Sequence, residues 1–312
     1  MIVDYHMHLR DPEERIDHSL AAVERFVEVA TERGVDEIGF TEHIYYFEQT
    51  RGLWDQQYMV ERCAHDLDRY VGAVTAAKER GLPVKLGLEV DYVAGRERET
   101  ADVLEPYPWD YLLGSVHYVD GFPVDQEPGL VEKLGPHEAW RRYFVWLRNA
   151  ARSGLFDSLA HPDLAKHHGP RPDTETIQWV HEETADAIEA AGVCIEVSSA
   201  GLHKPVGELY PDPPLLEACH ARGVPITLAS DAHIPQNVGR DLDHAVGLAR
   251  AAGYETVTVF DRRERRQEQL GRASSESDWG WTPTPSRTAS RWYSGESRSN
   301  RRRASRATRT GT

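Results

Sequence analysis

The feature that most limits the fold is a regular alternation of short apolar runs and longer amphipathic runs over residues 1–270. The apolar runs have the length of buried strands, and the amphipathic runs have the 3.6-residue spacing of helices. Repeated strand–helix–strand units predict parallel strands joined by helical crossovers. Seven or eight such units favour a closed α/β barrel, with an open sheet as the alternative. The predicted strands are residues 2–5, 37–41, 84–90, 111–116, 156–160, 193–197 and 224–229, with 256–260 as a candidate eighth.

Helices are predicted between these strands, and each predicted helix has a glycine within two residues of its end. Glycine is the residue that most readily takes the left-handed conformation that ends a helix. The helix over residues 174–191 also has a clear start, because Pro172 and Asp173 precede it. The predicted helices are residues 19–33, 55–80, 137–152, 174–191, 213–222 and 241–252.

Composition narrows the class of protein. No apolar run reaches the ~18 residues of a membrane span, and the start of the chain lacks the pattern of a signal peptide. Three cysteines without a C-x-x-C spacing give no disulfide framework and no zinc ribbon. We therefore expect a cytoplasmic protein with no membrane partner, and its oligomeric state is not predicted.

Residues 271–312 differ sharply from the rest of the chain. From Arg272 onward this segment has no Leu, Ile, Val, Met or Phe, and its nine Arg and three acidic residues give a local charge of +6. Such a segment cannot bury enough apolar area to offset the entropy of ordering, so we predict a disordered Arg/Ser/Thr-rich tail. The whole-chain charge of −15 then leaves −21 on the body. A body so acidic disfavours a nucleic-acid partner.

Metal-ligand residue types follow six of the seven predicted strands. In a parallel barrel the carboxyl ends of all strands meet at one face, and that face carries the active site. Residues i and i+2 of an extended segment point to the same side, so two ligand residues separated by one residue can bind one ion together. The residues at the strand ends are His6 and His8, His43, Glu89, His117, His161, and Asp231 and His233.

Imidazoles and carboxylates are ligands of borderline divalent ions such as Zn²⁺, Mn²⁺ and Fe²⁺. With His18, just ahead of the first predicted helix, the candidates number nine, too many for one tetrahedral ion. They suit two or three divalent metal ions (Zn, Mn or Fe) with a bridging carboxylate. A lone histidine at a strand end is usually incidental, but ligand types at six of seven strand ends favour a metal centre. Neither a phosphate-binding Gly-rich loop nor a G-x-S-x-G nucleophile motif occurs.

With this order of ligand-type residues, residues 1–265 resemble the PHP (polymerase and histidinol phosphatase) superfamily. Within it the chain is most similar to the monofunctional histidinol-phosphatase family. The segments that carry this closer resemblance are Gly114-Ser-Val-His-Tyr-Val119, residues 153–164, residues 199–205 and residues 208–211.

The resemblance implies a distorted (β/α)₇ barrel over residues 1–270 with a trinuclear metal site. His6, His8, Glu89 and Asp231 would hold one metal. Glu89 would bridge to a second metal, completed by His117 and His161, and His18, His43 and His233 would hold the third. These ligand sets are those of the superfamily, transferred to the matching residues of this chain.

The implied activity is hydrolysis of L-histidinol phosphate to L-histidinol and phosphate, a step of histidine biosynthesis. Paired ions lower the pKa of a bridging water and neutralise the phosphate, so attack of a metal-bridging hydroxide is expected. Asp231 or His233 would protonate the leaving alkoxide. The candidate phosphate contacts are Lys166, Arg171, His203 and Lys204, each of which is equally well explained as a surface cation.

Alternatives remain at this level. The enzyme alternative is a PHP phosphoesterase that acts on another small phosphate ester or on a phosphotyrosyl protein. The non-enzyme alternative is a PHP module that uses metals for structure alone. For the imidazole and ammonium of L-histidinol phosphate, Glu42, Tyr45, Tyr118 and Asp163 are candidate partners, and structural roles explain each of them as well.

Overall fold

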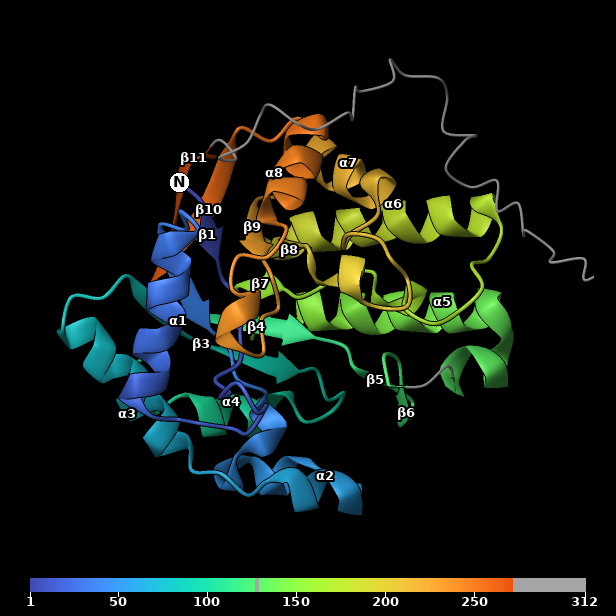
Figure 1. Ribbon diagram of the computed structural model, residues 1–312. Coiled ribbons are helices and arrows are strands. Elements are labelled where there is room, and N and C mark those ends of the chain that lie inside the picture. Colours follow the sequence, from blue (N-terminus) through green and yellow to red (C-terminus); the bar gives the residue numbers. More distant parts are fainter. Residues whose placement is uncertain (127–128, 272–312) are drawn as a thin grey trace, which may run out of the picture. The chain divides into compact units, whose positions relative to one another are not determined.

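The computed structural model describes residues 1–126 and 129–271. Seven parallel strands form its centre. These are β1 Val3–Asp4, β2 Glu37–Phe40, β3 Val84–Asp91, β4 Tyr111–Ser115, β7 Ser158–Leu159, β8 Cys194–Ser198 and β9 Ile226–Ala229. They pair in the order β1-β2-β3-β4-β7-β8-β9 and curl into a nearly closed barrel (Figure 1). The Tyr5 N–H donates to the Leu228 carbonyl at 2.9 Å and so joins the first strand to the last.

Helices surround the barrel as the sequence pattern predicts (Figure 1). In the first helix, Ala22, Val23 and Phe26 share the buried face, and Ser19 caps the start by accepting a hydrogen bond from the Ala22 N–H. None of the described helices has the length and apolar character needed to cross a membrane. The helices are α1 Leu20–Glu32, α2 Gln57–Arg62, α3 Leu67–Glu79, α4 Glu97–Leu104, α5 Gly129–Arg152, α6 Thr174–Ala191, α7 Pro213–Ala221 and α8 Leu242–Ala251.

Two predicted helices differ from the observed ones. Residues 55–80 form α2 and α3 rather than one helix. The side chain of Asp66 accepts a hydrogen bond from the Asp68 N–H and so caps the start of a new helix. Helix α5 starts eight residues earlier than predicted and is kinked at Gly135, whose φ of 73° lies in the left-handed region just before Pro136. Helix α4 was not predicted.

The candidate eighth strand exists but does not join the barrel. β10 Thr256–Asp261 pairs antiparallel with β11 Glu264–Gln269 as a separate two-stranded sheet. A second small hairpin, β5 Tyr118–Val119 with β6 Phe122–Pro123, follows β4. The chain still packs on the barrel at Gly271, whose N–H donates to the Met1 carbonyl at 2.9 Å. The remaining residues of the predicted tail, 272–312, lie outside the described residues.

Aromatic rings fill the barrel interior. Tyr111 stacks on Tyr5 and on Phe260, with ring centroids 5.2 and 5.3 Å apart, and its hydroxyl donates to the Tyr5 carbonyl. A Cβ at Gly39 or Gly87 would lie within 3 Å of the Tyr111 side chain. Glycine at these two strand positions therefore makes room for the ring.

Candidate metal centre

Glu89, near the carboxyl end of β3, is fully buried at the centre of a histidine cluster. Its Oε2 lies 2.6 Å from His43 Nδ1 and 3.5 Å from His6 Nε2. Its Oε1 lies 3.2 Å from His161 Nε2 and 3.4 Å from His117 Nε2. Four imidazoles from four different strand ends thus surround the two oxygens of one carboxylate. That is the position a bridging carboxylate requires.

Asp231, after β9, forms a second focus beside the first. Its Oδ1 is 3.4 Å from His8 Nε2 and 3.6 Å from both His6 Nε2 and His233 Nδ1. Asp231 has a φ of 51° and His161 a φ of 26°, which are conformations that residues other than glycine rarely adopt. Backbone strain of this kind tends to collect at functional sites.

Buried Asp4 on β1 holds the segment that carries Asp231. Its two oxygens accept hydrogen bonds from the backbone N–H groups of Ser230 and Gly239, each at 2.8 Å. Burial raises the pKa of Asp4 to about 6, although these hydrogen bonds oppose the shift. The first strand therefore fixes the last strand end at the site.

Eight of the nine predicted ligands come together. Several of their ligand atoms, including His6 Nε2, His8 Nε2 and Glu89 Oε2, are buried and make no hydrogen bond among the described residues. Buried polar atoms are normally paired, so these atoms fit a divalent cation as their partner. Four overlapping groups have ligand atoms within 4.8 Å of one another: His6, His8 and Asp231; His8, His43 and His233; His43, Glu89 and His117; and His6, Glu89 and His161.

Three further carboxylates orient the imidazoles. The Nδ1 atoms of His6, His8 and His117 face these carboxylates, which leaves each Nε2 directed at the centre. This role of Glu196 and Asp91 was not predicted, because only the barrel brings them behind the histidines. The pairs are His6 with Glu196 at 2.7 Å, His8 with Glu42 at 3.2 Å, and His117 with Asp91 at 2.9 Å.

The electrostatics of the cluster keep Glu89 ionised and shift the pKa values of its histidines in opposite directions. Burial alone would raise the pKa of Glu89, but the surrounding imidazoles, His43 first among them, hold it well below its usual range. Burial and the neighbouring His8 lower the pKa of His43 to about 3. Asp91 and Glu89 outweigh burial at His117 and raise its pKa to about 10. An ionised carboxylate and a neutral imidazole are the forms that bind a metal, so Glu89 and His43 are ready to do so, whereas His117 has to give up a proton when the metal binds.

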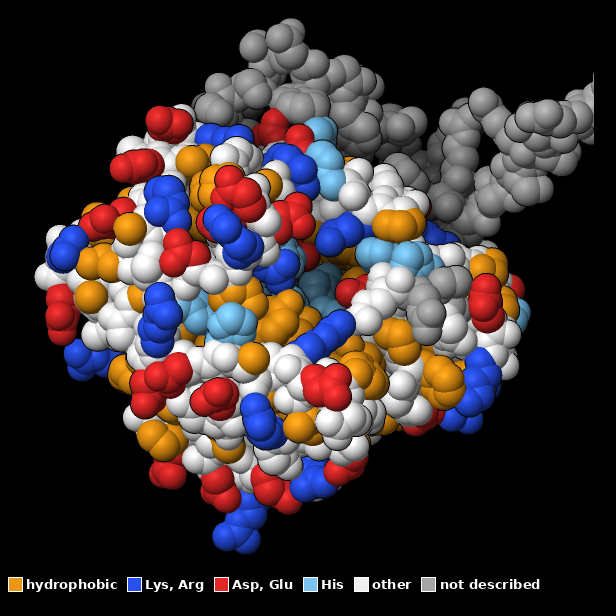
Figure 2. Space-filling view, turned by 60° about the horizontal axis from the view of Figure 1, so that its bottom comes forward, with side chains coloured by type: hydrophobic (Ala, Val, Ile, Leu, Met, Phe, Trp, Pro, Cys, Tyr) orange, Lys and Arg blue, Asp and Glu red, His pale blue; other side chains and the backbone are white. Residues whose placement is uncertain are grey.

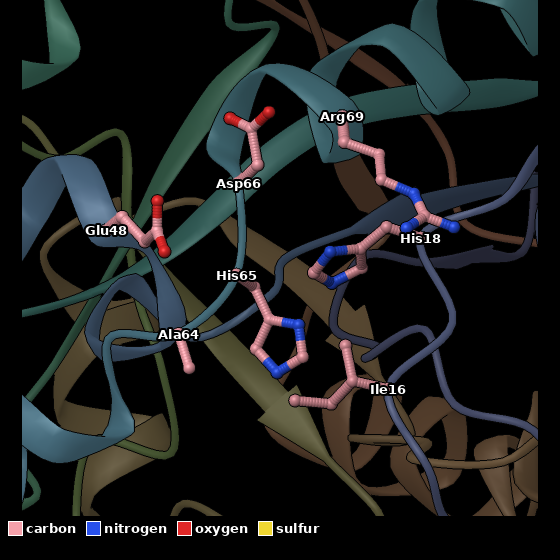
Figure 3. A pocket seen from close by; sticks show the side chains of 7 residues that line it. All are labelled: Ile16, His18, Glu48, Ala64, His65, Asp66 and Arg69. Atoms are coloured by element: carbon pink, nitrogen blue, oxygen red, sulfur yellow. The ribbon is translucent and has the colours of Figure 1, made fainter.

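His18 lies apart from the four groups. Its Nε2 is 3.2 Å from Glu42 Oε2, so it contacts the carboxylate that orients His8. On its other side it lines a cavity of about 260 Å³ together with His65, Glu48 and Arg69 (Figure 3). Its role as a metal ligand stays a prediction.

Two of the predicted phosphate contacts lie in a buried ion-pair cluster. Lys166 Nζ lies 2.6 Å from Asp212 and 2.9 Å from Asp163, and its side chain has no exposed surface. Arg171 is 3.2 Å from Asp212 and also pairs with Glu208. The structure therefore gives both cations carboxylate partners from this chain.

The other two predicted phosphate contacts lie on the surface. His203 Nε2 is 2.5 Å from Asp241. Lys204 is exposed and forms no ion pair in the described part of the chain. Burial alone would raise the pKa of Asp231, but His6, His8 and His233 lower it well below its usual value, and the charge of Lys204 adds a smaller effect in the same direction. Of the four, Lys204 is the cation that remains available beside the metal-ligand cluster.

Two arginines near the cluster were missed. Arg10 donates to the Tyr46 hydroxyl at 3.0 Å, and its charge contributes to the lowered pKa of His233, behind burial and His8. Arg62 lies 5.4 Å above the ring of Tyr45. Arg10 follows His8 by two residues, which is a usable signal, whereas nothing in the sequence connects Arg62 to the site. Figure 2 shows a hollow that contains histidine side chains and has basic and hydrophobic side chains around it.

Comparison with known proteins identifies the family of this chain. A protein from Deinococcus radiodurans called probable histidinol-phosphatase is 32% identical over 252 residues, which cover 79% of this chain and 93% of that protein. The histidinol-phosphatase of Bacillus subtilis is 27% identical, with 69% of this chain and 88% of that protein covered. The histidinol phosphate phosphatase of Lactococcus lactis, solved with zinc, L-histidinol and phosphate, has the same fold at a TM-score of 0.67 and 21% identity, covering 85% of this chain and 98% of its own. The model of the PHP domain matches residues 4–200, and the chain belongs to the PHP domain family.

Proposed function

We propose that this protein is a metal-dependent phosphomonoesterase that hydrolyses L-histidinol phosphate to L-histidinol and phosphate. The observation that carries the proposal is the Glu89 carboxylate enclosed by imidazoles from four strand ends. The identity of the proposed substrate comes from the names of the relatives called histidinol-phosphatase. A place in histidine biosynthesis and in the cytoplasm follows from that activity as a prediction.

The proposed centre holds two or three divalent ions of zinc, manganese or iron. Glu89 is the proposed bridging ligand, and the remaining ligands are His6, His8, His43, His117, His161, Asp231 and His233, with His18 as a ninth. When bound, such ions lower the pKa of a coordinated water and neutralise a phosphate dianion.

The side chains at the open side of the cluster define where the ester binds. Asp231 and His233 are the most exposed of the grouped ligands, with 13% and 29% of their side chains accessible. We assign to this pair the proton that the leaving alcohol oxygen requires. Lys204 and Arg10 supply positive charge for phosphate oxygens outside the metal shell, because no carboxylate among the described residues pairs with them.

Phosphate release from a panel of esters tests the function. The protein is stripped with a chelator, reconstituted separately with Zn²⁺, Mn²⁺ and Fe²⁺, and assayed with L-histidinol phosphate, a nucleotide, a sugar phosphate and a phosphotyrosyl peptide. We expect the stripped protein to be inactive and L-histidinol phosphate to lead by at least about 100-fold in kcat/KM. Flat rates after reconstitution would leave a metal phosphoesterase and remove the substrate assignment.

The carboxylate behind His117 gives a separate prediction. Asp91→Asn keeps the shape of the side chain but removes the charge that orients and polarises the imidazole. We expect metal affinity to fall by about 10-fold or more. Competition with a chromophoric chelator measures this, and Asp102→Asn on the exposed face of α4 is the matched control. Unchanged affinity in Asp91→Asn would show that His117 needs no such partner.

A further inference from the structure

Asp125 follows the β5–β6 hairpin and is held beside the metal-ligand cluster. The N–H of Val124, the residue before it, donates to the carbonyl of His117 at 2.9 Å. The carbonyl of Asp125 itself lies 2.5 Å from His168 Nε2. Contacts on two sides therefore fix this stretch of backbone next to a predicted metal ligand, and the side chain has a defined place.

The carboxylate of Asp125 lacks a cationic partner. Its Oδ1 is buried and makes no hydrogen bond, and no Lys, Arg or His of the described residues forms an ion pair with it. The nearby cation Arg62 reaches the Tyr118 hydroxyl instead, at 3.4 Å. An unpaired buried carboxylate oxygen is costly, so a partner from outside the chain is expected to satisfy it.

A carboxylate oxygen of Asp91 is likewise buried without a hydrogen-bond partner among the described residues. Asp91 bonds His117 through Oδ1, while its Oδ2 is buried and finds no hydrogen-bond partner in residues 1–126 and 129–271. Burial is the main cause of the raised pKa of Asp91, and the charges of Glu89 and Asp125 add to it. Asp125 also contributes to the raised pKa of His117, behind Asp91 and Glu89, which together outweigh burial. The Asp125 side chain is thus within electrostatic reach of the metal-ligand cluster.

Aromatic rings lie around the same region. Tyr45 stacks on His43 with ring centroids 4.7 Å apart, and the charge of Asp125 adds to the effect of burial in raising its pKa. Tyr118, at the start of the hairpin, accepts a hydrogen bond from Gln126, the residue after Asp125. Carboxylates beside aromatic faces favour organic cations, which gain both charge pairing and cation–π contact.

We propose that Asp125, with Tyr45 and Tyr118, forms a subsite for the positively charged end of the substrate's alcohol half, an ammonium or imidazolium group. This inference rests on the proposed function, since it takes the phosphate end to lie at the metal-ligand cluster. The subsite selects compact phosphate esters of amino alcohols over esters of uncharged alcohols. Asp125 acts here in specificity and not in the chemical step.

Substrate selectivity of Asp125→Asn tests the subsite. The metal-loaded full-length protein is assayed with L-histidinol phosphate and phosphoethanolamine as cationic esters, and with glycerol 3-phosphate as the ester of an uncharged alcohol. We expect kcat/KM to fall about 30-fold for the cationic esters and less than about 3-fold for the uncharged one, because only the former lose a charged pair. Asp125→Glu, which keeps the charge, is expected to recover part of the loss.

Asp120→Asn is the matched control, because Asp120 lies on the same hairpin but is exposed and pairs with Arg142. The subsite is overturned and the proposed function stands if wild-type protein prefers L-histidinol phosphate and Asp125→Asn lowers kcat/KM equally for all esters or for none. If wild-type protein prefers phosphoethanolamine and Asp125→Asn removes that preference, the subsite stands and the proposed substrate falls. A wild-type preference for glycerol 3-phosphate overturns both.

Discussion

Glu89→Gln is expected to lower kcat by about 10³-fold or more while leaving the barrel folded. Glutamine has nearly the same shape, but it is uncharged and replaces one carboxylate oxygen by an NH2 group, which cannot bind a cation. Glu89 Oε2 faces His43 and His6, and Oε1 faces His161 and His117, so the substitution disturbs both sides of the proposed bridge. Steady-state phosphate release, with metal content measured on the same sample, checks the result.

Glu79→Gln on the exposed end of α3 is the matched control and is expected to behave as wild type. Thermal unfolding with and without added Zn²⁺ separates loss of metal from loss of fold. Added metal should raise the Tm of the wild-type protein and of Glu79→Gln, and should raise that of Glu89→Gln much less, because a ligand stabilises only the state that binds it. A Glu89→Gln protein with near-wild-type turnover would rule out the bridging role.

Strand ends could be predicted because two local patterns coincide. Apolar runs such as residues 84–90 give the strand, and the ligand-type residue stands within or directly after the run. Topology then does the rest, since parallel strands bring their carboxyl ends to one face. These patterns predicted the parallel strands and favoured a barrel of seven or eight units, and the structure brings eight of the ligand candidates together at a seven-stranded one.

Contacts between distant segments could not be predicted in this way. In the sequence, Glu196 is one residue of a predicted buried strand, and nothing local marks it as a partner of His6. Only the barrel places its Oε2 2.7 Å from His6 Nδ1. Asp125 lies just after a short hairpin, where the sequence has no periodicity, and its importance comes from its Oδ1 having no hydrogen-bond partner in the part of the chain that the structure describes. The break between α2 and α3 was missed because helical spacing continues across residues 63–66, where the Asp66 cap decides the outcome.

The partners of the charged residue Lys166 could not be predicted from the sequence either. From the sequence, Lys166 is a candidate phosphate contact and is equally well explained as a surface cation. The structure places Asp212, 46 residues further along the chain, 2.6 Å from its ammonium group. The Leu209 carbonyl also accepts from Nζ at 2.6 Å. These partners use the hydrogen-bonding capacity of the ammonium group, which argues for a structural role.

Lys166→Met is therefore expected to destabilise the protein by about 3–5 kcal/mol, because it leaves Asp163 and Asp212 buried and facing each other without the shared cation. For a domain of this size that corresponds to a fall in Tm of roughly 10 °C. Thermal unfolding measures it. The matched control is Lys204→Met, which removes the same charge from an exposed side chain that pairs with none of the described carboxylates. It should change stability by less than about 0.5 kcal/mol while raising KM. A Lys166→Met protein with wild-type Tm and a raised KM would reverse the two roles and return Lys166 to the substrate.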